Sequence, residues 1–184
     1  MSSKPIKQAG FTLVELVIVI LVLGILAATA MPRFMNVNTS AFKAAVAGVA
    51  GGFGSALQLG HAQWVVGGNN GTVASLAGFG AGNVAFSSNG WPTDTAGATS
   101  VPASAAGATQ CASIWSGIMQ NPPSIATNAT GSDWCAATPT VAGQCTYIYL
   151  KDSPSASSCA TTATGVSRYF TYDSTSGSVA LTNP

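Results

Sequence analysis

Charged side chains are scarce in this sequence. Only 6% of its 184 residues are Asp, Glu, Lys or Arg, and the formal net charge is +1. An ordinary soluble domain has about 25% charged residues, so most of this protein's surface is expected to be small or neutral polar. With so little positive charge, the composition gives no support for binding to nucleic acid.

Groups that carry catalysis or bind metals are equally sparse. The chain has one histidine, His61, and five acidic residues that are scattered along it. The glycine-rich stretch at 78–82 lacks the Lys-Ser/Thr that completes a phosphate-binding loop. Two carboxylates near the C-terminus, Asp152 and Asp173, make only a thin case for a calcium site. We therefore predict that the protein is not an enzyme and uses no cofactor or metal ion.

The four cysteines all lie in the C-terminal half, at Cys111, Cys135, Cys145 and Cys159. They form no CxxC pair, which argues against a zinc site. An even number of cysteines in a region rich in Ser and Thr indicates disulfides formed in an oxidising compartment. Pairing 111 with 145 and 135 with 159 is favoured, because it ties a short helix to the first C-terminal strand. The sequential pairing, 111 with 135 and 145 with 159, fits nearly as well.

The longest apolar run covers residues 11–31. A helix of that length spans roughly 30 Å, the thickness of the hydrocarbon layer of a membrane. Lys4 and Lys7 precede the run, and this positive charge favours an N-terminus held in the cytoplasm. Three polar residues interrupt the run: Thr12, Glu15 and Thr29.

The acid in this run needs an explanation, because a carboxylate in lipid costs a few kcal/mol. A simple membrane anchor, or a secretory signal peptide cleaved after Ala30, leaves Glu15 unexplained. Cleavage between Gly10 and Phe11 explains it, because the new α-amino group is a cation four residues before Glu15. In a stack of parallel helices, Glu15 of one copy would pair with the Phe11 amine of the next. Such a pair neutralises two groups that a dry core would penalise.

The same junction resembles that of a known family. The stretch "GFTLVELVIVI" (10–20) is similar to the N-terminal motif of type IV prepilins and type II secretion pseudopilins, and the resemblance covers roughly residues 7–33. It implies cleavage after Gly10 by an aspartic prepilin peptidase, which also N-methylates Phe11. It further implies a precursor in the bacterial inner membrane, from which an ATP-driven pilus assembly machinery builds a helical homopolymer.

Residues 11–66 are predicted to form one long helix, with a membrane or assembly half at 11–31 and an amphipathic half at 32–66. Gly24 weakens the helix by roughly 1 kcal/mol, and Pro32 removes a backbone donor, so the helix should bend or loosen there. Both match positions where pilin helices unwind or kink. In the second half, a stripe that should dock the globular domain recurs every three or four positions, at Phe42, Val46, Val49, Phe53, Ala56, Gly60 and Trp64.

The rest of the chain is predicted to form a small globular domain. Turn-rich residues 67–110 indicate an exposed connecting loop with short edge strands at 72–76 and 83–86. A short helix is expected within 111–124, where Pro122 and Pro123 stop it. Runs of β-branched and aromatic residues predict strands of an antiparallel sheet at 145–150, 166–173 and 177–181. With "SDWCA" (132–136), these runs resemble the C-terminal domain of mannose-sensitive haemagglutinin (MSHA) type pilins.

These observations lead to an α+β fold of the type IV pilin kind, with a prepilin leader at 1–10, the long helix at 11–66 and a globular domain at 67–184. The expected function is that of a structural subunit of a type IV pilus, which serves adhesion and surface colonisation as an extracellular filament. One alternative is a type II secretion pseudopilin, and another is a membrane-anchored or secreted monomeric binding protein.

Processing gives the first test. The mature protein should begin at N-methylated Phe11, because the motif directs cleavage after Gly10. Intact mass and N-terminal sequencing of protein from sheared surface material would show this, and replacing Gly10 with a bulky residue should leave uncleaved precursor in the membrane. An N-terminus at Met31 would instead establish the signal-peptide interpretation.

Overall fold

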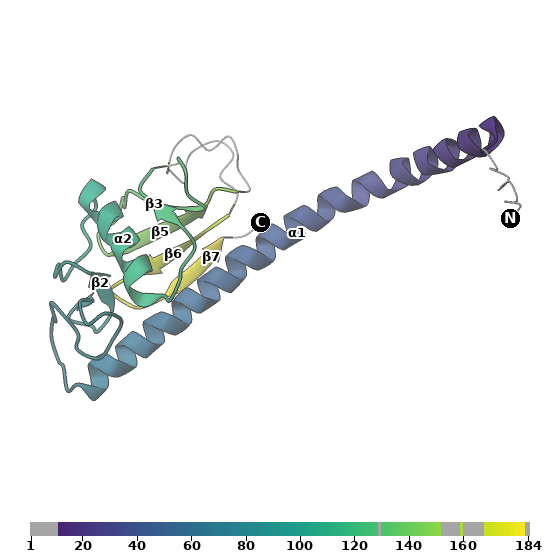
Figure 1. The fold of residues 1–184 in the computed structure, drawn as a ribbon. Helices are drawn as coiled ribbons and strands as arrows, with labels where there is room; N and C mark the ends of the chain where they lie inside the picture. The colour runs from purple at the N-terminus through teal and green to yellow at the C-terminus, as the bar shows by residue number, and fades with distance from the viewer. Residues whose placement is uncertain (1–10, 129, 152–158, 160–167, 183–184) are drawn as a thin grey trace, which may run out of the picture. The chain divides into compact units, whose positions relative to one another are not determined.

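The computed structural model describes residues 11–128, 130–151, 159 and 168–182, with the backbone alone at 32–37. Over these residues the chain is α+β, with a long N-terminal helix followed by a mostly antiparallel sheet and a second helix (Figure 1). This pilin-like architecture confirms the predicted fold class. Residues 42–184 form one compact unit, and the chain before residue 42 forms another.

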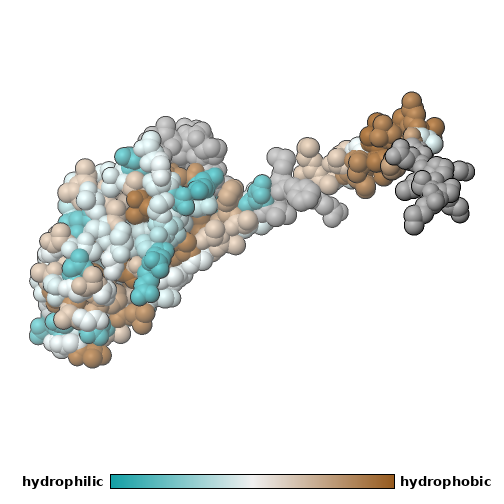
Figure 2. All heavy atoms as spheres, in the orientation of Figure 1, coloured by the Kyte–Doolittle hydropathy of each residue, from teal (hydrophilic) through white to brown (hydrophobic). Residues whose placement is uncertain are grey.

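Helix α1 spans Leu13–Val66. Its segment Leu13–Met31 has a mean hydropathy of 2.8 and is long and apolar enough to cross a membrane. The side chains of this segment are exposed in the isolated chain, and Figure 2 shows them as a nearly continuous hydrophobic surface. A helix that is apolar on all sides requires a covering of lipid or of other apolar helices.

The second half of α1 buries one face within the compact unit. The buried residues are spaced three or four apart, as one face of a helix requires: Val46, Ala50, Phe53, Leu57 and Gly60. The predicted stripe is confirmed at Val46, Phe53 and Gly60, but the prediction left out Ala50 and Leu57, which are also buried. Val49 and Ala56, which also belong to the predicted stripe, are only half-buried at its margin.

The sheet has the strand order β3-β4-β5-β6-β7. Its strands are β3 Ile125–Ala126, β4 Trp134–Ala137, β5 Gln144–Tyr149, β6 Tyr169–Asp173 and β7 Val179–Thr182. The β3–β4 pair is parallel and the remaining pairs are antiparallel. The strands predicted at 145–150, 166–173 and 177–181 are confirmed as β5, β6 and β7, although residues 166 and 167 lie outside the described part of the chain.

The core is a cluster of aromatic rings between the helices and one face of the sheet. Because side chains alternate along a strand, Tyr147, Phe170 and Tyr172 share that face. Phe53 of α1 lies among these three rings and Trp115, with ring centroids between 5.0 and 6.0 Å apart. Each such tilted or edge contact adds about 0.5–1.5 kcal/mol beyond simple burial.

The two core tyrosines also satisfy buried backbone carbonyls. The Tyr147 hydroxyl donates to the carbonyl of Cys111 at 2.9 Å, and the Tyr172 hydroxyl donates to that of Pro92 at 2.7 Å. Burial raises the pKa of both hydroxyls well above the ordinary value of 10, so both stay protonated as donors. These bonds join helix α2, through Cys111, and the strand that begins at Pro92 to the five-stranded sheet.

The prediction of an exposed loop at 67–110 is only partly right. The segment contains two short strands that pair antiparallel, β1 Ala85–Phe86 and β2 Pro92–Asp94. Several of its apolar residues are buried in the core: Leu76, Val84, Phe86 and Val101. Leu76, Val84 and Phe86 lie in the stretches predicted as edge strands, 72–76 and 83–86, which are too short to show a period that would have placed them inside. Val101 stands alone between Ser100 and Pro102.

Helix α2 spans Ala105–Ile118, so the predicted helix was right in kind but misplaced. It begins earlier because the stretch "AAGATQ" (105–110) is rich in alanine, the best helix former. It ends before Pro122 and Pro123, at a Met119 with extended backbone. The predicted apolar face is confirmed where the helix covers it, at Ile114, Trp115 and Ile118.

Two disulfides join the four cysteines, and their pairing is the favoured one of the alternatives above. Cys111 in α2 is bonded to Cys145 in β5, and Cys135 in β4 is bonded to Cys159. The Cα atoms lie 5.5 Å and 5.9 Å apart, respectively. Bonds that close loops of this size stabilise a domain by about 2–4 kcal/mol each.

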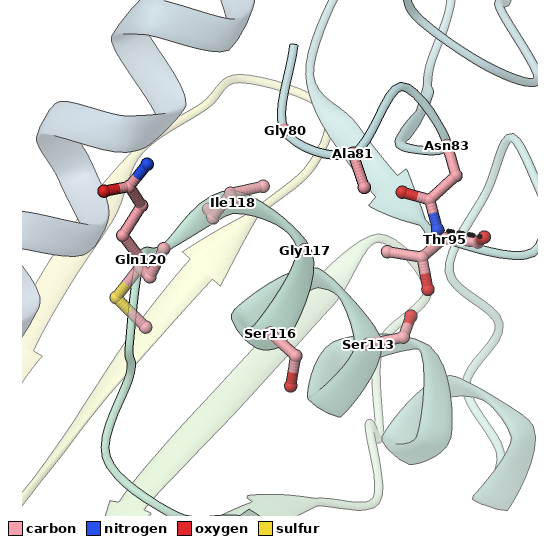
Figure 3. Close-up of a pocket in the computed structure, with 10 residues that line it drawn as sticks. Gly80, Ala81, Asn83, Thr95, Ser113, Ser116, Gly117, Ile118 and Gln120 are labelled. Carbon is pink, nitrogen blue, oxygen red and sulfur yellow. Dashed lines mark hydrogen bonds between the residues drawn. The ribbon is translucent and has the colours of Figure 1, made fainter.

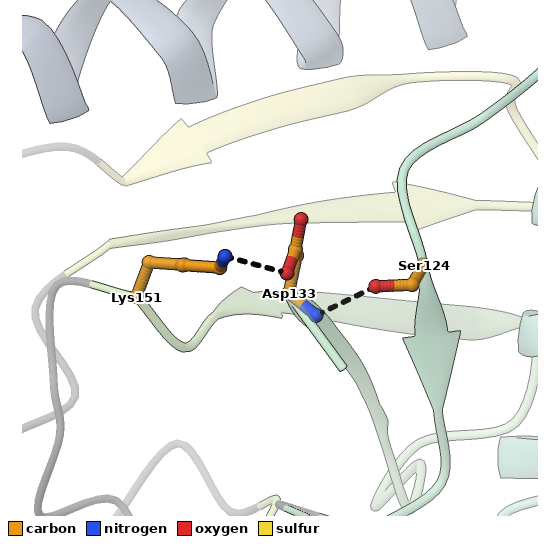
Figure 4. Close-up of polar contacts among 3 residues, drawn as sticks. All are labelled: Ser124, Asp133 and Lys151. Atoms are coloured by element: carbon orange, nitrogen blue, oxygen red, sulfur yellow. Dashed lines mark hydrogen bonds and ion pairs between the residues drawn. The ribbon is translucent and has the colours of Figure 1, made fainter. Parts of the chain in front are cut away.

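An ion pair lies on the surface near the second disulfide (Figure 4). Lys151 Nζ is 3.1 Å from Asp133 Oδ1, and the backbone N–H of Asp133 donates to Ser124 Oγ at 2.9 Å. The side chains of Lys151 and Asp133 are 58% and 41% exposed, so solvent screens the pair and it stabilises the fold by no more than about 1 kcal/mol. Its contribution is small beside that of the aromatic core.

The turn between β6 and β7 lies against Trp91. Gly177 in this turn has a φ of 72°, and a Cβ added to it would overlap the ring of Trp91. The Trp91 ring also stacks on His61, with centroids 4.2 Å apart. The ring therefore fills the space that a side chain at 177 would need.

Gly177→Ala should lower the free energy of unfolding by about 2–5 kcal/mol, from the left-handed backbone and the clash together. Gly131→Ala is the matched control, because Gly131 has a φ of 81° but no atom within 4 Å of the added Cβ. It should lose only the backbone part, about 1–2 kcal/mol. Urea unfolding of the full chain in detergent, followed by tryptophan fluorescence, would measure both. Equal losses would show that the Trp91 contact is unimportant.

Candidate functional site

The start of α1 is closed by a reciprocal pair of hydrogen bonds between Thr12 and Glu15. The backbone N–H of Thr12 donates to Glu15 Oε2 at 2.8 Å, and the N–H of Glu15 donates to Thr12 Oγ1 at 3.3 Å. The Thr12 hydroxyl also donates to Glu15 Oε2, at 2.7 Å. This is a capping box, in which the N-cap residue and the third helical residue satisfy each other's free backbone donors.

Glu15 therefore has a local role that the sequence analysis missed. The signal was present, because Thr12 and Glu15 have the Thr-x-x-Glu spacing of a capping box just before an apolar run. Both contacts with Thr12 use one carboxylate oxygen, Oε2. Within the described part of the chain, Oε1 has no hydrogen-bond partner, so this oxygen is available to a group from outside the subunit.

The other residues singled out in the N-terminal segment are placed as follows. Phe11 precedes the helix with its side chain 94% exposed, whereas Gly10 and the predicted leader lie outside the described residues. Gly24 lies within α1, and a Cβ added to it would meet no atom within 4 Å. Helix α1 also runs through Pro32, and bending at Gly24 or Pro32 stays a prediction.

His61 packs in an aromatic stack. Its ring is nearly parallel to those of Trp64 and Trp91, at centroid distances of 5.9 Å and 4.2 Å, and its Nδ1 lies 2.8 Å from the carbonyl oxygen of Gly90. A Cβ at Gly90 would lie within 3 Å of both His61 and Trp64. These contacts give the histidine a packing role at the end of α1.

Comparison with known proteins concerns the same N-terminal segment. A family model described as the prokaryotic N-terminal methylation motif matches residues 6–31. The matched stretch includes Gly10, Phe11 and Glu15. No curated protein and no solved structure matches the chain.

The motif stands at the start of a pilin-like fold. The chain is a type IV pilin-like or pseudopilin-like protein. Proteins of this kind are structural subunits and not enzymes. The motif implies processing by a prepilin peptidase and handling by an assembly machinery, and together with the apolar helix it indicates a precursor in the inner membrane.

The capping box gives a local prediction. Thr12→Ala should destabilise the first turn of α1 by about 1 kcal/mol, which corresponds to roughly fivefold faster exchange of its amide protons. Thr12→Ser, which keeps the hydroxyl, should behave like the wild type. Thr29→Ala is a control for the same chemical change, because Thr29 Oγ1 donates to the Leu26 carbonyl within the helix and caps nothing. Hydrogen exchange of the protein in detergent micelles would detect the difference, and unchanged exchange in Thr12→Ala would refute the cap.

Proposed function

We propose that this protein, cleaved after Gly10 and N-methylated at Phe11, polymerises into a type IV pilus of the MSHA-like kind that mediates adhesion and surface colonisation. The filament is a helical homopolymer outside the cell, and the inner membrane holds the precursor before assembly. The observation that carries this proposal is the outer face of the second half of α1.

None of the exposed residues between 41 and 66 is charged, and the one charged residue of this stretch, Lys43, is half-buried. Its exposed residues are almost all small or apolar: Ala41, Ala44, Ala45, Ala47, Gly48, Gly51, Gly52, Ser55, Gln58, Leu59, Ala62, Val65 and Val66. The exposed face of a helix in a monomeric soluble protein is normally charged or polar. Small residues instead permit close approach of another helix. A neutral face of this kind therefore favours a subunit whose helix is covered by neighbouring copies, over a monomeric binding protein.

The N-terminal turn supplies the contact that aligns the copies. Cleavage leaves a cationic amine on Phe11, and Oε1 of Glu15 is free of partners from its own described chain. Pairing the amine of an incoming subunit with Glu15 of its neighbour neutralises both groups in the apolar centre of the filament. Since every subunit carries one of each, the pairing repeats along the whole polymer and fixes the axial step.

The exposed part of the compact unit favours a pilus over a secretion pseudopilus. Its surface is built from neutral Ser, Thr, Asn and Gly residues with few charges, and two disulfides hold the domain together. Covalent bonds of this kind stabilise small domains outside the cell. These properties suit a fibre that persists on the cell surface better than a short-lived element of a secretion machine.

Glu15→Gln tests the inter-subunit pairing apart from the cap. Glutamine also completes a capping box, so the variant keeps the start of the helix but loses the charge. We expect Glu15→Gln and Glu15→Ala to abolish surface filaments or reduce them sharply, because an unpaired amine buried in a dry core costs about 3–5 kcal/mol. Thr12→Ala, which weakens the cap but keeps the carboxylate, should still assemble. Immunoblots of sheared-surface and inner-membrane fractions, with electron microscopy, would measure filament yield.

Normal filaments from Glu15→Gln would show that the charge is unnecessary and that Glu15 serves the helix alone. Loss of the variant from the membrane fraction as well would indicate a defect in insertion. Cells with the assembly-defective variant should adhere poorly to surfaces while still secreting folded exoproteins. Loss of that secretion would favour the pseudopilin alternative.

A further inference from the structure

Two Asn-Gly pairs occur in the chain, Asn70-Gly71 and Asn89-Gly90. Asparagine is among the thermolabile residues of proteins. In an Asn-Gly pair, the backbone nitrogen of the glycine can attack the side-chain carbonyl carbon, Cγ, of the asparagine and close a five-membered ring. Glycine favours this attack because it has no side chain to shield the nitrogen and its backbone adopts most conformations. The surroundings of the two pairs differ in ways that bear on this reaction.

The pair Asn70-Gly71 is open to ring closure. It lies just after the C-terminal end of α1, and the side chain of Asn70 is exposed. Among the described residues, neither the side-chain amide of Asn70 nor the backbone N–H of Gly71 has a hydrogen-bond partner. The attacking nitrogen and the carbon that it attacks are therefore not held apart by bonds to other groups.

The pair Asn89-Gly90 is held in place by hydrogen bonds at both reacting groups. Asn89 Nδ2 donates to the carbonyl of Thr175 at 2.8 Å, and the N–H of Gly90 donates to the carbonyl of Ser87 at 3.0 Å. Gly90 is also buried. Ring closure at this pair requires a local opening of the fold that breaks both hydrogen bonds.

A third asparagine, Asn83, is exposed but also bonded. It lines a hollow of about 530 Å³ together with Thr95, where Gly80 and Gly117 let two segments approach closely. Asn83 Nδ2 donates to the Thr95 carbonyl at 3.3 Å (Figure 3). The residue that follows is Val84, and its branched side chain crowds the nitrogen that would have to attack. Asn70 thus differs from Asn83 in its free amide and in the residue after it, and not in exposure.

From these contacts we infer that Asn70 is a site of spontaneous deamidation. The nitrogen of Gly71 forms a bond to Cγ of Asn70, and the bond from Cγ to Nδ2 breaks. The proton of the Gly71 N–H passes through water to Nδ2, which leaves as ammonia. The product of this first step is a succinimide ring between the two residues.

Water then opens the ring at one of its two carbonyl carbons. Opening at Cγ restores the main chain and gives aspartate at position 70. Opening at the backbone carbonyl carbon gives isoaspartate, in which the main chain runs through the side-chain carbons. Either route consumes one water, releases one ammonia and needs no oxidant or enzyme, so the modified fraction rises with the age of the protein.

Both products change the end of α1. The Gly71 carbonyl accepts from Trp64 Nε1 at 3.2 Å, and Asn69 Nδ2 donates to the Trp64 carbonyl at 3.0 Å. Isoaspartate adds one carbon to the main chain just before Gly71 and so displaces the carbonyl that Trp64 binds. Aspartate and isoaspartate both place a carboxylate beside the C-terminal end of a helix, where the partial charge is already negative. Deamidation should therefore loosen the last turn of α1.

The test follows the full chain in detergent micelles at neutral and mildly alkaline pH. Chymotrypsin, used after reduction at a mildly acidic pH that suppresses further ring closure, gives one peptide with Asn70 (65–79) and one with Asn89 (87–115). Mass spectrometry measures conversion in both, and an isoaspartyl methyltransferase labels the isoaspartate. We expect Asn70 to convert faster as the pH rises, since the attacking nitrogen must lose its proton. Asn89 should convert at least about tenfold more slowly, because it reacts only from the locally opened form.

Gly71→Ala is the control variant. A Cβ at Gly71 would meet no atom within 4 Å, so the variant should fold as the wild type does. Its methyl group hinders the approach of the nitrogen and should slow conversion at Asn70 about tenfold. In guanidinium chloride, which unfolds the chain, Asn70 and Asn89 should convert at similar rates.

Four outcomes would overturn the inference. Equal rates at Asn70 and Asn89 in the folded chain would show that the hydrogen bonds protect neither residue. Absence of conversion at Asn70 in the folded chain would show that its loop forbids ring closure. Conversion of Gly71→Ala at the wild-type rate would refute the attack by this nitrogen. A difference between the two asparagines that persists in guanidinium chloride would show that flanking sequence, and not the fold, selects Asn70.

Discussion

The packing of Phe53 into a cage of four aromatic rings is the interaction on which the compact unit depends. Phe53 comes from the long helix, and the cage comes from α2 through Trp115 and from the sheet through Tyr147, Phe170 and Tyr172. Full burial of one large apolar side chain is worth about 1.5–3 kcal/mol, and the ring contacts add to it. The chain has few charged residues and many glycines, so this aromatic cluster and the two disulfides are the main features that stabilise the compact unit. The Cys111–Cys145 bond ties α2, and with it Trp115, to the sheet, so the covalent bond and the aromatic cage support each other.

Fixing one face of α1 in this way determines what the other face can do. The residues at 46, 50, 53 and 57 are buried in the core and Val49 and Ala56 pack at its margin, so the other residues of this stretch face away from it. Those positions carry Ala, Gly and other uncharged residues, and the helix therefore presents a smooth surface that suits contact with further helices. One helix thus serves the fold with one face and, on our proposal, the polymer with the other. The low overall charge of the chain is consistent with this division, because a helix that is covered on both sides does not face water and needs no charged side chains.

How much of this could be predicted from the sequence differs by element. The apolar segment, the docking stripe around Phe53 and the last three strands follow from hydrophobic period and β-branched or aromatic content, and the structure places them close to where they were predicted.

The start of α2 could not be predicted in the same way, because alanine and glycine carry little hydrophobic signal, and "AAGATQ" resembles a loop until its helix propensity is considered. Most buried residues of the segment at 67–110 lie in apolar pieces too short to show a period, within a turn-rich sequence, and only their tertiary contacts show that they are core. The hollow at Thr95 is a product of tertiary approach, through Gly80 and Gly117, that no local pattern contains. The cap at Thr12, by contrast, is readable from the Thr-x-x-Glu spacing, and it was missed because a pairing with a neighbouring subunit was the only role predicted for Glu15.

The cap changes how the proposed assembly contact has to be understood. In the membrane, a carboxylate without a hydrogen-bond partner would have the full free-energy cost of leaving water, whereas Glu15 in the structure already accepts two hydrogen bonds from Thr12. The stored subunit therefore holds its carboxylate in a polar setting made from its own first turn, and this lowers the penalty of placing it in an apolar run.

Because both bonds end on Oε2, an amine from a neighbour can approach Oε1 without breaking the cap. Assembly would then add a partner and would not exchange one for another. The same first turn holds the carboxylate in a defined direction before the partner arrives, which reduces the conformational entropy lost when the pair forms. On this view, Thr12 holds the carboxylate of Glu15, which is costly in lipid, in the position where it can pair with the neighbour's amine.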